Sequence, residues 1–296
     1  NRVMGYYRDS FQVAHLILAH NVPDHLFRLV ERLRRPDAHI FIHVDAKSDI
    51  SPYRIQFADY PDVHLIQKRT KANWGGFSLV QATLDSLIEI QASGKPFTYV
   101  NLLSGSDYPI KPIRDFHSML TKSMGLSFFE YEIEGTSWWD EAQPRLRNYH
   151  WVDCQFPGKY GLQALVNRIT PSRTLPGRMA IVGRSQWFTV YAGHVRHILD
   201  FVRNNPAYVR FFRYTWGPDE FFFQTILYNS PYRDQLINDN LRYIDWSTGQ
   251  PSPRVLTIDD AQLLHSSDKW FARKFDPQIS GPLLDEIDSW ITTEKT

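Results

Sequence analysis

The chain of 296 residues has almost no cysteine and no excess of charge of one sign. Cys154 is the single cysteine, so no disulfide can form within the chain and a reducing compartment is expected. Since 33 Lys and Arg residues are balanced by 32 Asp and Glu residues, the net charge is +1 and no nucleic-acid partner is expected. No apolar run reaches the roughly 18–20 residues that a transmembrane helix needs. We therefore expect a cytoplasmic location, with peripheral attachment to an inner membrane as an open alternative.

The motifs of several common enzyme classes are also missing. The first apolar segment is not followed by GxGxxG and no GxxxxGK[ST] occurs, which argues against the usual dinucleotide and P-loop folds. Neither HExxH nor CxxC is present and the His residues are scattered, so no metal site is expected. The segment GRSQW (183–187) resembles a nucleophile elbow only loosely, because it lacks the second glycine. A serine hydrolase is therefore not expected.

Strand and helix patterns alternate in the first 125 residues. Short apolar segments predict strands at 13–19, 39–44, 63–67 and 97–103, and amphipathic patterns predict helices at 23–34 and 77–90. Repeated strand–helix–strand units predict an α/β fold with a mostly parallel central sheet flanked by helices. Further on we expect strands at 126–131, 179–184, 186–191 and 241–246, helices at 193–204, 218–228 and 259–265, and a loop at 134–178. No linker occurs, so residues 1–296 are expected to form one domain with two halves, about 1–125 and about 126–296.

Polar side chains follow three of the predicted strands. His20, Asp45 and Asp107 come shortly after the segments 13–19, 39–44 and 97–103. Ligands of parallel sheets bind at the carboxyl ends of the strands, where an acid can hydrogen-bond a uracil or a ribose. Helix caps and turns use the same residue types, so a purely structural role stays open for each.

The segment GPDEFFF (217–223) combines a proline, two acids and three aromatic residues. Pro218 followed by acids is typical of a helix start, where carboxylates stabilise the helix dipole. Glu220 also precedes the three aromatic residues, and a carboxylate fixed against an apolar wall can act as a general base. A helix cap and a catalytic base are both compatible with this pattern.

Two cations in the last part of the chain have apolar neighbours in the sequence. Arg254 lies in SPRVLT (252–257) and Lys274 in FARKFD (271–276). Such cations can bind a diphosphate, Arg as a planar fork and Lys as a point charge. From the residues alone, diphosphate binding is the less common role of such cations.

Six segments together resemble one family, the core-2/I-branching β-1,6-N-acetylglucosaminyltransferases and the peptide O-xylosyltransferases (glycosyltransferase family 14). They are HVDAKSD (43–49), NWGGFSLVQATLDSL (73–87), YVNLLSGSDYPIKP (99–112), GPDEFFFQTIL (217–227), NSPYRDQLINDNLRYIDW (229–246) and FARKFD (271–276). They occur in the order of the family, and together they span most of the chain outside 130–180. Segments 74–76 and 229–246 are closer to the xylosyltransferases, whereas 43–45 and 271–276 are closer to the core-2 enzymes. The resemblance leaves the donor sugar open between N-acetylglucosamine, slightly favoured, and xylose.

The resemblance implies a GT-A-type fold and an inverting, metal-independent transfer of a sugar from a UDP-sugar to a hydroxyl of a glycan or glycoconjugate, with no cofactor. The half at about 1–125 would bind the nucleotide sugar, and the half at about 126–296 would bind the acceptor and carry catalysis. By this likeness Glu220 is the general base, and Arg254 and Lys274 stabilise the UDP diphosphate. The remaining implied contacts are His20, Asp45, Trp74 and Asp107 for the donor and Trp246 for the acceptor.

The chain also departs from the family. Golgi members carry many cysteines and a membrane anchor, and their near absence here predicts a bacterial, cytoplasmic relative that builds a cell-surface glycan. The segment 130–180 matches poorly, so the acceptor is not implied. Two alternatives stay open: a Mn²⁺-dependent transferase of the same fold with Asp107 as a metal ligand, and a non-catalytic carbohydrate-binding protein that uses its Trp and Tyr faces.

Overall fold

The computed structural model describes residues 11–20 and 23–292. Its strands are β1 (Val13–Ala19), β2 (Ala38–Val44), β3 (Val63–Leu65), β4 (Tyr99–Ser104), β5 (Tyr108–Pro109), β6 (Ser127–Glu132), β7 (Gly183–Tyr191), β8 (Leu236–Asn238), β9 (Arg242–Ile244) and β10 (Phe271–Arg273). Its α-helices are α2 (Pro23–Leu33), α3 (Ser51–Gln56), α4 (Phe77–Ala92), α5 (Ile113–Lys122), α6 (Ser137–Arg147), α7 (Lys159–Ile169), α8 (Ala192–Asn204), α9 (Pro206–Arg213), α10 (Phe222–Tyr228), α11 (Ala261–His265) and α12 (Pro277–Ile291). Short 3₁₀ turns include η2 (Pro218–Glu220) and η4 (Ile258–Asp260).

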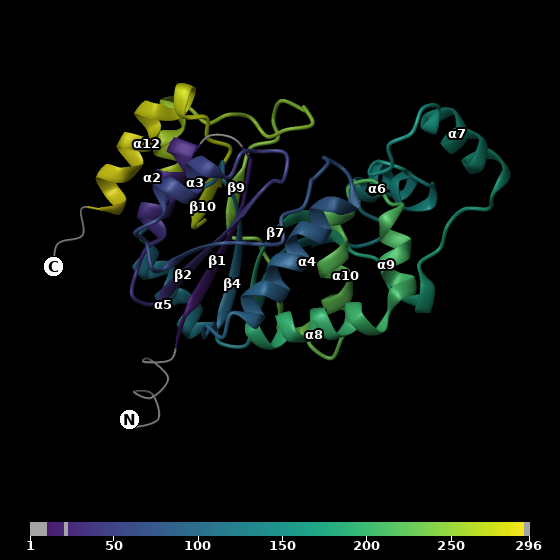
Figure 1. Ribbon diagram of the computed structural model, residues 1–296, viewed down its shortest axis with the longest axis horizontal. Coiled ribbons are helices and arrows are strands. Elements are labelled where there is room, and N and C mark those ends of the chain that lie inside the picture. Colours follow the sequence, from purple (N-terminus) through teal and green to yellow (C-terminus); the bar gives the residue numbers. More distant parts are fainter. Residues whose placement is uncertain (1–10, 21–22, 293–296) are drawn as a thin grey trace.

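Strands from both halves of the chain form one seven-stranded sheet in the order β3-β2-β1-β4-β7-β6-β8. Strands β1 to β4 pair in parallel, β7 runs antiparallel to β4 and β6, and β8 is parallel to β6. A small second sheet has the order β5-β10-β9. The predicted α/β fold with a mostly parallel, helix-flanked central sheet is confirmed (Figure 1).

Helices cover both faces of this sheet, which explains the continuous apolar runs in its strands (Figure 1). Alternate side chains of a strand point to opposite faces. On β1, Val13 and Ile17 belong to the core shared with α2, α5 and α12. Ala14 and Leu16 belong to the other core, shared with α4, α8 and α10. A strand between two such cores must be apolar at nearly every position.

The predicted elements of the first half are confirmed with small shifts at their ends, whereas three predictions for the second half are wrong. The expected loop at 134–178 contains α6 and α7. In place of the expected strands at 179–184 and 186–191 there is the single strand β7, which stays paired with β6 although the register shifts between Phe129 and Tyr131. The expected helix at 218–228 is divided at Phe221 into η2 and α10.

Helix α7 projects away from the rest of the molecule (Figure 1) and contains no buried residue. Helix α6, by contrast, packs Trp139, Ala142 and Leu146 into the core on the α4 side of the sheet. Throughout residues 11–20 and 23–292, helices fall short of the length and hydropathy that crossing a membrane requires.

Candidate functional site

The carboxyl ends of β1, β2 and β4 meet at one edge of the sheet. The Asp45 amide donates a hydrogen bond to the Ala19 carbonyl at 2.8 Å, and the Gly105 amide donates to the Leu18 carbonyl at 2.9 Å. His20 follows β1 at this edge and is exposed. The edge therefore brings together the polar segments that follow these three strands, as the sequence predicts.

The Asp45 carboxylate anchors the loop 70–76 to this edge. One oxygen accepts a hydrogen bond from the Lys47 amide at 2.7 Å, and the other accepts from the Ala72 amide at 3.2 Å. The His43 ring nitrogen Nε2 accepts from the Thr70 amide at 3.0 Å, which fixes the start of the same loop. Asp45 is largely buried, and its carboxylate holds the conformation of the loop that carries Trp74.

Asp107 lies behind the edge rather than on it. Its carboxyl is fully buried, accepts a hydrogen bond from the Ser104 amide at 2.9 Å, and has the Arg273 Nε atom 3.4 Å away. Burial raises the pKa of Asp107, and the Arg273 guanidinium acts in the opposite direction. That guanidinium also lies 4.2 Å from the centre of the Trp187 ring. The carboxyl of Asp107 is thus enclosed by protein groups.

The loop 70–76 contacts the segment that carries Glu220. The Gly217 amide donates to the Gly75 carbonyl at 2.8 Å, and the Trp74 and Trp216 rings meet edge to face at 4.9 Å. Gly217 has a φ of 60°, and a Cβ there would lie 2.5 Å from Arg145 Nη2. Glycine is required at this position both by its backbone conformation and by the close approach of the guanidinium. Trp74 keeps 64% of its surface exposed, so its ring is open to a ligand.

The carboxylate of Glu220 is held by Arg145 of helix α6. Arg145 Nη2 lies 2.7 Å from Glu220 Oε2, and the guanidinium also donates to the carbonyls of Trp216 and Gly217 at 3.2 Å. It lies 4.9 Å and 4.8 Å from the ring centres of Trp216 and Phe221. The Glu220 side chain remains 31% exposed. The carboxylate is therefore fixed in place and partly open to solvent.

The neighbouring carboxyl, Asp219, lies in different surroundings. Burial and, to a smaller extent, the neighbouring Glu220 carboxylate together raise the pKa of Asp219 to about 7. The two adjacent carboxyl groups therefore differ: the buried Asp219 retains its proton to a higher pH, whereas Glu220 is accessible to solvent.

Strand β7 joins this cluster to the strand ends. It is antiparallel to β4, so it begins at the edge where β4 finishes. At its start, a Cβ on Gly183 would lie 2.3 Å from the Glu220 carbonyl oxygen, and further along, Trp187 contacts Arg273 beside Asp107. Glu220 and Asp107 consequently lie at the same end of the sheet.

Asp153 joins the loop 70–76 to the segment before α7. Its carboxylate accepts hydrogen bonds from Asn73 Nδ2 at 2.8 Å and from the Ser78 amide and hydroxyl at 2.9 and 2.6 Å. A Cβ on Gly76 would lie 2.5 Å from an oxygen of Asp153. The carboxylate thus occupies the N-terminus of α4, where the helix dipole favours a negative charge.

The two predicted diphosphate ligands differ in how far they are already engaged. Arg254 donates to Asp245 from Nε at 2.7 Å and to both oxygens of Asp260 at 3.0 and 2.6 Å. Among the described residues, the one polar contact of Lys274 Nζ is with the Ser252 hydroxyl, at 3.1 Å.

Lys274 lies beside the 104–107 turn, because the Phe275 amide donates to the Ser106 carbonyl at 2.9 Å. Trp246 is half exposed and lies on the 245–254 loop with Arg254. Among the described side chains, no hydrogen bond or ion pair joins Glu220 to Arg254 or Lys274.

Sequence reasoning missed Arg145, Trp216 and Asp153. Arg145 and Trp138 are seven residues apart, two helical turns, and Arg145 lies 5.8 Å from the Trp138 ring. That spacing was a signal, but it falls in the segment expected to be a loop.

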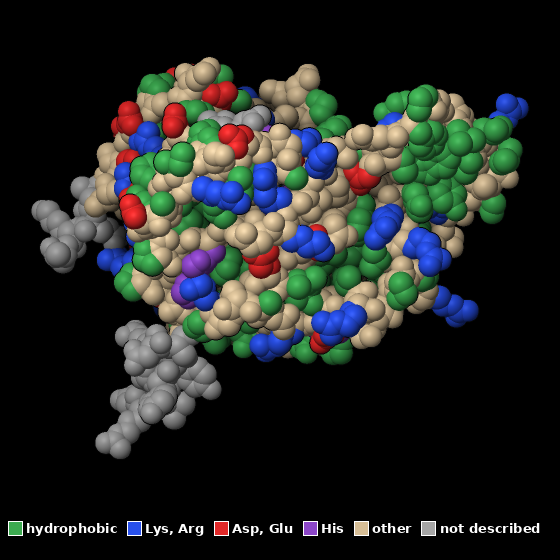
Figure 2. Space-filling view, in the orientation of Figure 1, with side chains coloured by type: hydrophobic (Ala, Val, Ile, Leu, Met, Phe, Trp, Pro, Cys, Tyr) green, Lys and Arg blue, Asp and Glu red, His purple; other side chains and the backbone are tan. Residues whose placement is uncertain are grey.

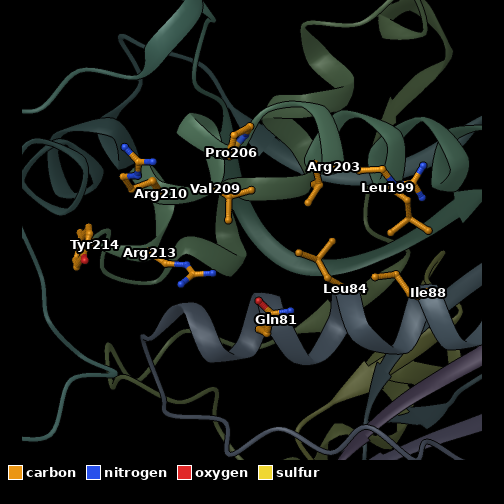
Figure 3. A pocket seen from close by; sticks show the side chains of 11 residues that line it. Gln81, Leu84, Ile88, Leu199, Arg203, Pro206, Val209, Arg210, Arg213 and Tyr214 are labelled. Atoms are coloured by element: carbon orange, nitrogen blue, oxygen red, sulfur yellow. The ribbon is translucent and has the colours of Figure 1, made fainter.

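Two further features bear on ligands. In the part of the chain that the structure describes, no three His, Cys, Asp or Glu side chains are grouped so that they could hold a metal ion. A cavity of about 670 Å³ lies between α4, α8 and α9 (Figure 3), and neither the predicted site residues nor Arg145 line it. Its lining combines apolar side chains such as Leu84 and Val209 with Arg203, Arg210 and Arg213.

Comparisons with known proteins place these observations in context. The sequence model of the family described as "Core-2/I-Branching enzyme" matches residues 13–265. "Xylosyltransferase oxt" of Drosophila melanogaster is 26% identical over 89% of this chain and 31% of its own length. "Xylosyltransferase 2" of Rattus norvegicus is 25% identical over 94% and 33%. The solved apo structure of mouse xyloside xylosyltransferase 1 matches with 10% identity and a TM-score of 0.41, covering 88% of this chain and 96% of the other. The chain spans about a third of the length of the curated relatives it matches.

Proposed function

The chain belongs to the Core-2/I-Branching enzyme family, and on that premise we propose that it is a glycosyltransferase which moves a sugar from a UDP-sugar to a hydroxyl of a glycan or glycoconjugate. The observation that carries the proposal is the Glu220 carboxylate, fixed by Arg145 at 2.7 Å and still accessible at the edge where the sheet strands end. Since the curated relatives are named xylosyltransferases, UDP-xylose is the first donor to test, followed by UDP-N-acetylglucosamine.

The proposed reaction is a direct displacement with inversion. The acceptor hydroxyl transfers its proton to the Glu220 carboxylate, and its oxygen forms a bond to the anomeric carbon from the face opposite UDP. The bond between that carbon and the β-phosphate oxygen breaks, and UDP leaves with the electron pair. No covalent enzyme intermediate is needed, so a positioned base is sufficient; such a base typically contributes about 10²–10⁴-fold to the rate. The exposed face of Trp74 is proposed to line the donor beside this carboxylate.

We assign the leaving diphosphate mainly to Lys274. Its ammonium lies beside the 104–107 turn and, within residues 11–20 and 23–292, contacts a single neutral hydroxyl, so it can turn toward phosphate oxygens without breaking an ion pair there. Arg254 would have to exchange at least one carboxylate partner before its fork could bind a phosphate. Fixed positive charge that meets the developing negative charge of UDP stabilises the transition state.

We further propose that the transfer does not depend on a metal ion. The acid that would have to bind Mn²⁺ in the alternative mechanism, Asp107, is fully buried and contacts the Arg273 guanidinium. A cation at that carboxyl would be forced beside an existing positive charge, which disfavours the site electrostatically.

The base assignment is tested with Glu220→Gln against Glu141→Gln, an exposed acid on α6. Glu220→Gln should lower UDP release from the donor at least about 10²-fold, while the affinity for UDP measured by titration calorimetry stays within about twofold. Glu141→Gln should leave both quantities unchanged. Full activity of Glu220→Gln would remove Glu220 from the reaction, and equal losses in both variants would indicate a general effect on the fold.

A further inference from the structure

Helix α7 turns its polar side chains toward the protein. Gln163 Oε1 accepts a hydrogen bond from the Trp151 amide at 2.8 Å. Four residues further on, Asn167 bonds the amide and the carbonyl of Tyr149 at 2.7 and 3.0 Å. Lys159 Nζ, four residues before Gln163, donates to the Cys154 carbonyl at 2.9 Å. Residues four apart lie on one side of a helix, so the polar side of α7 is consumed by contacts with the segment 149–154.

The apolar side chains of α7 are consequently left in solvent. Leu162, Leu165 and Ile169 are three and seven residues apart and are 46%, 52% and 70% exposed. Tyr160 on the same helix is 72% exposed, and Phe156 in the preceding loop is 42% exposed. Figure 2 shows these hydrophobic side chains gathered over the projecting helix. A contiguous apolar surface of this kind usually marks an interaction site.

The segment that carries this surface is charged with one sign only. Between Asp153 and Asp200 the sequence contains no acidic residue. The basic residues in this interval are Lys159, Arg168, Arg173, Arg178, Arg184 and Arg196. Arg168 is exposed on α7 itself and Arg178 is exposed in the segment that follows it, whereas Arg184 lies on β7 beside Glu130 and Arg196 lies on α8. Lys and Arg side chains lie at the rim of the apolar cluster in Figure 2.

We propose that α7 is a docking face for a lipid bilayer rich in anionic lipids. An exposed apolar helix face flanked by Lys and Arg binds such surfaces by burying apolar side chains among the acyl chains and placing cations among anionic headgroups. Tyr160 and Phe156 add the aromatic groups that favour the membrane interface. With 11 residues, α7 is much shorter than the roughly 20 residues of a spanning helix, so it lies along the surface.

A second copy of the chain fits this face less well. In a two-fold symmetric contact, each side presents the same residues to the other. Both sides of the contact would then carry Arg168 and the basic residues that follow it, and bringing two surfaces of the same charge together is unfavourable. An anionic lipid surface complements both the apolar and the basic part of the face.

The test is sedimentation of the purified protein with sucrose-loaded vesicles, either phosphatidylcholine alone or phosphatidylcholine with phosphatidylglycerol at equal amounts. Binding to the anionic vesicles is expected, with weakening at high salt. Leu165→Ser combined with Ile169→Ser should weaken it at least about tenfold, and Arg168→Gln about fivefold. The matched control combines Ile55→Ser and Ile279→Ser, two exposed apolar residues on α3 and α12, and should bind as the unchanged protein does.

Equal binding by the α7 variant and the control, or no binding to anionic vesicles, would overturn the proposal. Concentration-dependent dimerisation in analytical ultracentrifugation that is lost in the α7 variant, without vesicle binding by the unchanged protein, would instead identify a contact between copies. Circular dichroism of each variant verifies that it is folded. Vesicle binding is measured without donor or acceptor, so its outcome is independent of the proposed transferase activity.

Discussion

Arg145 fixes Glu220, so its replacement gives the sharpest perturbation of the candidate site. In Arg145→Gln, the shorter neutral side chain loses the 2.7 Å ion pair and the bonds to the Trp216 and Gly217 carbonyls. Hydrogen bonds of charged groups contribute about 1.5–3 kcal/mol each. Because the Glu220 side chain is 31% exposed and therefore partly screened, we expect a total loss of about 2–3 kcal/mol in the free energy of unfolding.

The effect on turnover should be larger than the effect on donor binding. Without its guanidinium partner the Glu220 carboxylate moves away from the acceptor hydroxyl, and a displacement of about 1 Å can lower the rate about 10²-fold. We therefore expect kcat to fall about 10²-fold in Arg145→Gln while the donor KM changes little. Urea unfolding and steady-state UDP release measure the two quantities.

Arg147→Gln, two residues further along α6, is the matched control. Its exposed guanidinium makes no hydrogen bond or ion pair with any described residue, so both quantities should stay unchanged. If Arg145→Gln were destabilised as expected but kept the kcat of the Arg147→Gln control, Arg145 would support the fold alone. That result would refute the assignment of Arg145 as a positioning residue for Glu220.

Three further predictions concern other parts of the site. Lys274→Ala should weaken UDP binding about tenfold in calorimetry. Arg254→Ala should in addition lower the free energy of unfolding by about 1 kcal/mol, because two carboxylates lose their partner. Equal free energies of unfolding for the two variants would contradict this difference between the two cations. Burial raises the pKa of Asp219 to about 7, so the native state binds more protons than the unfolded state and stability falls as the pH rises from about 4 to 7. In Asp219→Asn, urea unfolding measured at several pH values should show a loss of stability between about pH 4 and 7 that is smaller by up to about 4 kcal/mol. An unchanged dependence of the unfolding free energy on pH would contradict the raised pKa of Asp219. Gly75→Ala would place a Cβ 2.8 Å from Trp216 Nε1 at a φ of +75° and should lower stability by about 1–3 kcal/mol; an unchanged Tm would count against a rigid contact there.

The parallel half of the sheet could be predicted because burial on both faces leaves a strong trace in the sequence. Strands β1, β2 and β4 are apolar at nearly every position, and polar residues begin where they end. The segment 134–178 could not be predicted in this way. The apolar residues of α7 point to solvent and its polar residues make the protein contacts, which reverses the usual pattern of a surface helix.

The sequence predicts candidate residues for the site, but not the side chains that hold them in place. The six resembling segments singled out Glu220 and Trp74, and the family match over residues 13–265 confirms that resemblance. The partners of these residues are far away in the chain: Arg145 and Glu220 are 75 positions apart. Such a pairing depends on how the helices pack. The two carboxylates that bind Arg254 are only nine and six positions away, but the sequence pattern does not identify them as its partners.

The most direct test of the central claim is whether the protein releases UDP from UDP-xylose or UDP-N-acetylglucosamine in the presence of EDTA. We predict UDP release with each accepted donor, faster when a hydroxyl acceptor is supplied, unchanged by EDTA, and with inversion at the anomeric carbon by proton NMR. Activity that is lost in EDTA and restored by Mn²⁺ would contradict metal independence. Glycan binding without UDP binding or UDP release would contradict the assignment as a glycosyltransferase.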